Sequence, residues 1–138
     1  MESKVKGMME QLQKEHEKKR ELLSQAAAKS EKTARSIQEY SRQKLENEMV
    51  LKELELLSSD STVMKQIGPC LIKQDMFEAT GNVKKRIEYI SDELKRLEKQ
   101  KEGSDKEHDE LSIALGKIQD KVKTVVNEMQ AAGGPAVA

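Results

Sequence analysis

Residues 61–74 read STVMKQIGPCLIKQ, and this stretch decides the fold. Apolar residues lie on both sides of Gly68-Pro69, a pair that favours a turn because glycine adopts conformations closed to other residues and proline fixes its own φ. The pattern predicts a β-hairpin. Two strands alone are marginal in water. We therefore expect the hairpin to dock onto something outside itself.

The composition of the remaining chain is that of long helices. Charged residues make up 36% of the 138 residues and aromatic residues only 2%, which is little bulk for a globular core. The 25 basic residues balance the 25 acidic ones, so bulk charge favours neither a nucleic-acid nor an anionic membrane partner. We expect a mainly α chain, a long antiparallel coiled-coil hairpin with the short β-hairpin between its helices.

Four segments follow from this pattern. We expect an N-terminal coiled-coil helix over 1–57, a linker and β-hairpin over 58–74, a C-terminal coiled-coil helix over 75–130 and a disordered tail over 131–138. Asp75 with Glu78 three residues later is typical of a helix start.

Heptad seams run along both predicted helices, with apolar residues spaced alternately four and three apart. The first seam runs through Val5, Met9, Leu12, His16, Lys19, Leu23, Ala26, Ser30, Thr33, Ile37 and Tyr40. The second runs through Val83, Ile87, Ile90, Leu94, Leu97, Lys101, Ser104, His108, Leu111, Leu115, Ile118, Val122, Val125 and Met129.

Beyond Tyr40 the first seam has two interpretations, and the apolar residues Leu45, Met49 and Leu56 favour a phase shift like a stutter over Lys44 and Asn47. With Val50, Leu51, Leu54 and Leu57 they form a face wider than a two-helix seam requires. We expect something besides the second helix to cover this face.

The two seams match if the chain folds back at Ile67, because paired positions then have numbers that sum to about 134. The polar second-seam positions Lys101, Ser104 and His108 then meet Thr33, Ser30 and Ala26. A slip of one heptad would keep the same phase, and that alternative stays open.

The two free ends of the seams are apolar again beyond the polar layers. The residues there are Val5, Met8, Met9, Leu12, Val122, Val125, Val126 and Met129. Coiled-coil core explains the seam positions among them. The functional interpretation is an apolar tip that binds irregular partners, a role that suits the adaptable methionine side chain.

Residues for catalysis or metal binding are not apparent. His16 and His108 lie on seams, far apart in register and without a second ligand at metal spacing, so we interpret them as polar layers. We expect no enzyme, no catalytic residues, no metal and no cofactor. Cys70 cannot form an internal disulfide because the chain has one cysteine, and we expect it to be a buried, inert thiol. With no apolar run of membrane-spanning length, we expect a soluble, cytoplasmic protein.

The hairpin and its flanks resemble the β-class of the prefoldin family. The resemblance covers roughly residues 41–97, and outside them only the heptads match. It rests on Gly68-Pro69, Leu71-Ile72-Lys73-Gln74, Glu78-Ala79, Asn82-Val83, Lys85-Arg86-Ile87, Tyr89-Ile90, and in the first helix on Gln43-Lys44-Leu45-Glu46, Val50, Lys52-Glu53-Leu54 and Leu56-Leu57.

This resemblance implies a hexamer of α- and β-class prefoldin subunits, joined through β-hairpins. The assembly role maps onto Val63, Met64, Ile67, Leu71 and Ile72, and the tip role onto the apolar residues at the free ends. The implied function is an ATP-independent co-chaperone that holds unfolded proteins such as actin and tubulin and delivers them to the cytosolic group II chaperonin. The alternative is a coiled-coil scaffold or tether without chaperone activity, which leaves the hairpin unexplained.

Overall fold

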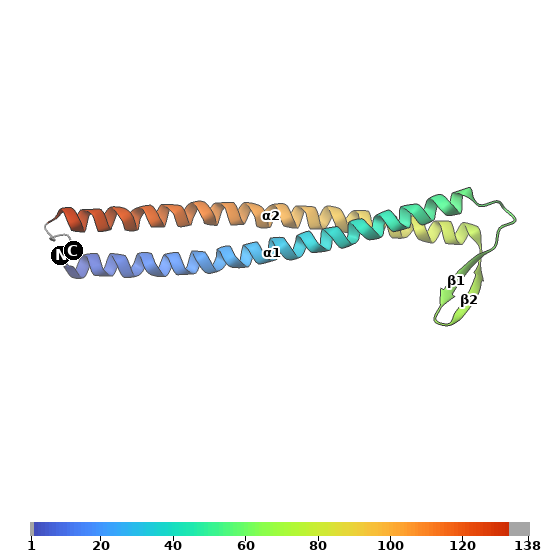
Figure 1. Cartoon of the computed structure of the whole chain (residues 1–138), viewed down its shortest axis with the longest axis horizontal. Helices are drawn as coiled ribbons and strands as arrows, with labels where there is room; N and C mark the ends of the chain where they lie inside the picture. Colours follow the sequence, from blue (N-terminus) through green and yellow to red (C-terminus); the bar gives the residue numbers. More distant parts are fainter. Residues whose placement is uncertain (1, 133–138) are drawn as a thin grey trace. The chain divides into compact units, whose positions relative to one another are not determined.

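Two long helices flank one β-hairpin in the computed structural model, which describes residues 2–132 (Figure 1). Helix α1 spans Glu2–Leu56 and α2 spans Met76–Ala131. Strands β1 (Val63–Ile67) and β2 (Cys70–Gln74) form an antiparallel two-stranded sheet. The predicted fold class is confirmed. Most of the predicted disordered tail, residues 133–138, lies outside the described residues, while Ala131 still belongs to α2.

Local sequence explains where the helices begin and end. Strong helix formers fill α1, and no proline interrupts it. The amide of Ala79 donates to the carbonyl of Asp75 at 2.9 Å, so Asp75 is the cap residue that precedes α2. At the end of α1 the amide of Leu57 bonds the carbonyl of Leu54, three residues back, which tightens the last turn before Ser58.

The chain forms two compact units. The terminal unit comprises Met1–Lys32 and Lys101–Ala138, and therefore contains the beginning of α1 and the end of α2. Every predicted seam position of this unit is buried or half-buried except Met129, which is exposed. Its buried side chains are those of Ala26, Ser104, Leu115 and Ile118.

The second unit, Thr33–Gln100, is called the hairpin unit here because it contains β1 and β2. Its core lies between the end of α1 and the beginning of α2. The buried side chains there are those of Thr33, Ala79, Val83, Ile90 and Leu97.

The expected phase shift beyond Tyr40 is wrong. The side of α1 that continues the seam carries Lys44, Asn47, Leu51 and Leu54, all half-buried, and their spacings of three and four keep the original heptad. Leu45, Met49 and Leu56 are exposed instead. The aliphatic stem of a lysine can cover apolar surface while its ammonium stays in water, so polar seam residues do not force a change of phase.

Two isoleucines of α2 give a matched test of this packing. Ile118 is 5% exposed and Ile113, on the same helix, is 62% exposed. We predict that Ile118→Ala lowers the free energy of unfolding by about 2 kcal/mol or more, because it leaves a cavity. Ile113→Ala should change it by less than about 0.5 kcal/mol. Urea unfolding followed by circular dichroism measures both, and equal effects would contradict the described packing.

Candidate functional site

The β-hairpin closes through a two-residue loop. Ile67 pairs with Cys70, which leaves Gly68 and Pro69 as the loop residues. Gly68 has a φ of +58°, and no other described residue has a positive φ. A residue with a positive φ followed by a proline fits a type II′ turn, whose twist matches that of antiparallel strands.

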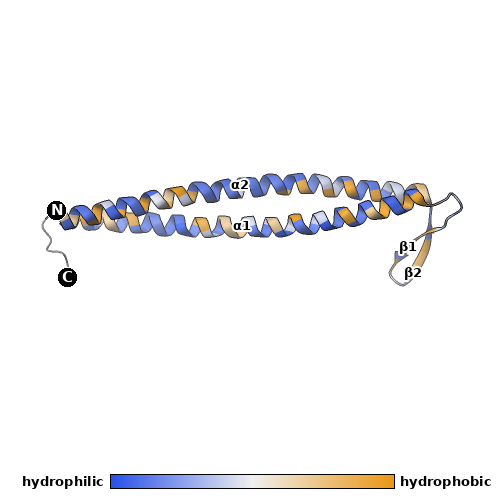
Figure 2. Ribbon diagram, turned by 45° about the horizontal axis from the view of Figure 1, so that its top comes forward, coloured by the Kyte–Doolittle hydropathy of each residue, from blue (hydrophilic) through white to orange (hydrophobic). Residues whose placement is uncertain are grey.

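Both faces of the hairpin carry apolar side chains. Directly paired residues share a face, so Val63, Ile67 and Ile72 lie on one side, and Met64 and Leu71 lie on the other. Val63 is half-buried and the other four are exposed. Both views show the hairpin projecting from the helices of its unit rather than covering them (Figures 1 and 2). The five residues predicted for assembly therefore form a two-sided apolar surface.

Cys70 is exposed, so the prediction that this chain buries its thiol is wrong. The prediction assumed that apolar neighbours would enclose the side chain. Because the hairpin lacks a cover from its own helices, the residue beside the turn stays in solvent.

The ends of the helices next to the hairpin also expose apolar side chains. Val50, Leu56 and Leu57 are exposed at the end of α1, and Phe77, the chain's one phenylalanine, is 85% exposed at the start of α2. Part of the predicted wide face is therefore exposed, and the expectation that something besides α2 covers it stays a prediction. Exposed apolar clusters of this kind mark protein interaction surfaces.

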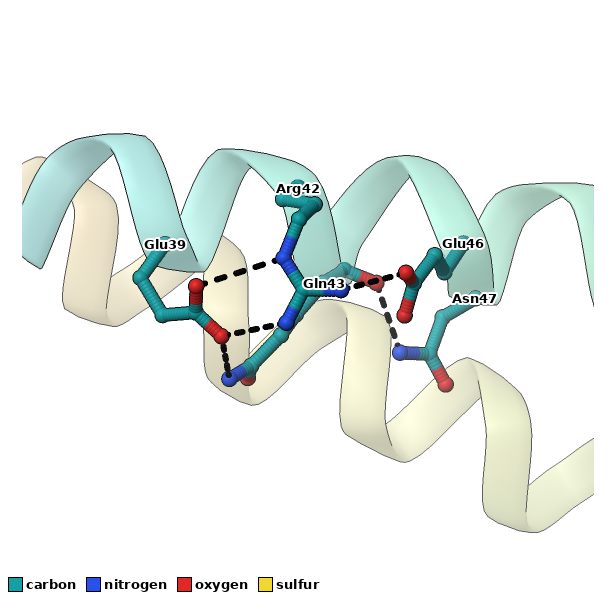
Figure 3. A network of polar contacts seen from close by, with 5 residues as sticks. All are labelled: Glu39, Arg42, Gln43, Glu46 and Asn47. Carbon is teal, nitrogen blue, oxygen red and sulfur yellow. Dashed lines mark hydrogen bonds and ion pairs between the residues drawn. The ribbon is translucent and has the colours of Figure 1, made fainter.

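A charged network lies on α1 within the same unit (Figure 3). Arg42 pairs with Glu39 and Glu46, and Gln43 donates to Glu39 at 3.1 Å. The hydrogen bond from Arg42, helped by that from Gln43, lowers the pKa of the Glu39 carboxyl. The network stabilises a helix surface and supplies no group suited to acid–base chemistry at neutral pH.

The residues predicted for a client-binding tip lie in the first turns of α1 and the last turns of α2. Met8, Val126 and Met129 are exposed, whereas Val5, Met9, Leu12, Val122 and Val125 are half-buried. Leu12 and Val122 line a shallow groove together with His16 and Gln119. The presence of Leu12 and Val122 in one groove agrees with the predicted register.

Sequence reasoning missed a polar network between the two helices of the terminal unit. The Ser30 hydroxyl donates to Asp105, and Lys101 Nζ donates to the same carboxylate at 2.7 Å. The hydrogen bond from Lys101 lowers the pKa of the Asp105 carboxyl most, and the hydrogen bond from Ser30 lowers it further. Asp105 lies beside the seam, and its only sequence signal is the four-residue spacing from Lys101.

Two absences hold for the described residues 2–132. No group of three or more histidine, cysteine, aspartate or glutamate side chains among them is placed to hold a metal ion. No helix in this part of the chain is long and apolar enough to cross a membrane.

Known proteins have similar sequences. The family described as prefoldin subunit matches residues 21–131. Prefoldin subunit 6 of Arabidopsis thaliana is 48% identical over 86 residues, which cover 62% of this chain and 67% of the relative. Prefoldin subunit 6 of Homo sapiens is 31% identical over 131 residues, which cover 95% of this chain and 100% of the relative.

One solved structure has the same arrangement of elements. The crystal structure of the prefoldin beta subunit from Thermococcus strain KS-1 superposes with a TM-score of 0.60, covering 88% of this chain and 94% of that one. At 21% identity this likeness supports the fold alone.

Gly68 and Gly81 provide a test of the turn, since an added methyl group would meet no neighbour at either position. We predict that Gly68→Ala destabilises the hairpin by about 1–2 kcal/mol, because alanine disfavours a positive φ. Gly81→Ala, inside α2, should instead stabilise the chain by about 0.5–1 kcal/mol. NMR contacts between Lys65 and Ile72 report the hairpin, and their persistence in Gly68→Ala would contradict this account.

The lowered pKa of Asp105 predicts how the stability of the folded chain changes with pH. Its pKa is lowered in the folded chain, so its contribution to stability is present above about pH 4 and is lost as the pH falls through the folded-state pKa. We predict that Asp105→Asn reduces the fall in melting temperature between about pH 4 and pH 2. Asp109→Asn, an exposed neighbour on α2, serves as the control. If both variants follow the wild-type curve, Asp105 does not couple the helices.

Proposed function

The chain belongs to the prefoldin subunit family, and from this premise we propose that it captures unfolded proteins without ATP as one subunit of a prefoldin hexamer. Family membership implies assembly with other prefoldin subunits. Within the β-class, the residues of the hairpin and its flanks predict a resemblance to prefoldin subunit 6. The relatives from Arabidopsis thaliana and Homo sapiens are both named prefoldin subunit 6. The finer proposals concern which residues assemble, which hold clients, and where the clients go.

One observation carries the proposal: the hairpin exposes apolar side chains on both faces. Backbone groups on strand edges can pair with neighbouring strands, and apolar faces gain stability when buried. We propose that Val63, Met64, Ile67, Leu71 and Ile72 join the hairpins of other α- and β-class subunits. A scaffold built on the heptads alone would not need these residues.

The client surface is proposed at the residues near the two termini. Met8, Val126 and Met129 are exposed within the terminal unit, with Val5, Met9, Leu12, Val122 and Val125 half-buried beside them. Flexible methionine side chains can fit many partner shapes. Several such weak contacts from different subunits raise the effective concentration of one bound client.

The proposed clients are unfolded proteins such as actin and tubulin, and the proposed acceptor is the cytosolic group II chaperonin, which places the protein in the cytoplasm. Release needs only competition from the acceptor, so no nucleotide, metal or other cofactor is invoked. We propose no enzymatic step.

The client surface can be tested without disturbing the fold, because three of its residues are exposed. We predict that the combined variant Met8→Gln, Val126→Gln and Met129→Gln enters the complex normally and loses most of its ability to suppress aggregation of unfolded actin. Ile113→Gln, a more exposed position away from the proposed surface, should protect as wild type does. Light scattering of diluted, denatured actin measures the effect.

Truncation of residues 1–12 and 122–138 extends the same test. The truncated chain should still assemble, because the hairpin unit is untouched. If complexes with the triple variant and with the truncated chain both protect actin fully, the client surface is wrong.

A further inference from the structure

The last three turns of α1 carry apolar side chains on two sides of the helix. At about 100° per residue, Leu45, Met49 and Leu56 point in directions within about 40° of one another. That direction is roughly opposite to the half-buried seam positions Leu51 and Leu54. The three residues, called the outward stripe here, are 60%, 56% and 86% exposed. Orange bands mark apolar residues along this part of α1 (Figure 2).

Acidic residues border the outward stripe on both sides. By the same helical geometry, Glu46 and Glu53 lie along one side and Glu48 and Glu55 along the other. Lys52 lies on the stripe itself, between Met49 and Leu56, and it is the only basic residue between Leu45 and Leu56. Arg42 already pairs with Glu46, so the four glutamates outweigh the single lysine. No basic residue occupies the last turn of α1, where the helix dipole adds partial negative charge. A partner for this surface should therefore be apolar and positively charged.

The β-hairpin of this chain has the chemistry that such a partner would need, which makes the corresponding hairpin of another family member the proposed occupant. Residues 61–74 contain Lys65 and Lys73 and no carboxylate. Both faces carry apolar side chains, and a run such as Cys70-Leu71-Ile72 is typical of a strand buried on both sides. Pairing with other strands satisfies the edges and leaves two faces to bury. If one face of the hairpin packs against other strands, the opposite face stays exposed until another element buries it. An apolar stripe on a helix can bury that face.

The chain's own hairpin does not cover its own outward stripe, since Leu45, Met49 and Leu56 are exposed with the hairpin in place. We propose that the outward stripe is a second assembly surface that receives the β-hairpin of a neighbouring, non-identical prefoldin subunit. Apolar side chains of that hairpin contact Leu45, Met49 and Leu56, and basic side chains, where that hairpin carries them, lie beside the glutamates. The inference rests on the proposed hairpin-mediated assembly and names its second contact.

Site-specific crosslinking identifies what covers the stripe. The photoreactive residue p-benzoylphenylalanine replaces Met49 in the full chain, which is co-expressed and purified with the other prefoldin subunits. We expect crosslinked peptides from the β-hairpin of a different subunit. The same residue at Ile113, equally exposed but in the terminal unit, should capture no hairpin. Crosslinks to a helix, to a second copy of this chain, or to nothing in the assembled complex would overturn the proposal.

Substitution tests whether the stripe contributes to affinity. The double variant Leu45→Gln and Met49→Gln should unfold at the same temperature as wild type when alone, since both side chains are exposed. It should enter the complex at least about tenfold more weakly in competition with wild type, because two buried apolar contacts are lost. Ile113→Gln is the matched control and should compete equally.

A hairpin variant separates this inference from the proposed function. Leu71→Asp places a charge on the proposed assembly face and should prevent incorporation. If Leu71→Asp assembles normally, the proposed hairpin assembly fails. If Leu71→Asp is excluded while the stripe variant assembles as wild type, the assembly stands and the outward stripe is not part of it.

Discussion

Burial of the hairpin's two apolar faces is the constraint on which the account of this protein depends. Met64 and Leu71 lie on one face and Ile67 and Ile72 on the other, and the chain leaves all four exposed. A two-stranded sheet gains little stability alone. We therefore propose that exposed apolar residues of the hairpin unit contact other chains, and membership of the prefoldin family implies that these chains are other prefoldin subunits.

Polar residues between the paired helices add a second constraint, because they fix the register of the pairing. A seam made only of leucine and isoleucine would be more stable but would accept several registers. In the terminal unit Asp105 of α2 accepts a hydrogen bond from Ser30 of α1 and another from Lys101 of its own helix. A slip of one heptad would separate Ser30 from Asp105. This network and the apposition of Leu12 with Val122 both agree with the register whose paired numbers sum to about 134.

Periodicity predicted most of the fold because the seam residues at positions such as Leu97 and Ile118 differ sharply from their charged neighbours. The same reasoning failed at Leu45 and Met49, where it assigned apolar residues to the interior although they face away from α2. One sequence cannot tell which partner an apolar residue contacts. For the same reason, sequence reasoning predicted a buried Cys70, although no other part of this chain covers that residue. Asp105 was missed because its hydrogen bond to Ser30 depends on the facing helix.

Native mass spectrometry of the chain alone and after co-expression with the other prefoldin subunits tests the central claim most directly. The account predicts that the chain enters a hexamer containing both α- and β-class subunits. A stable homodimer that takes up no other prefoldin subunit, even under co-expression, would contradict it and favour a coiled-coil scaffold.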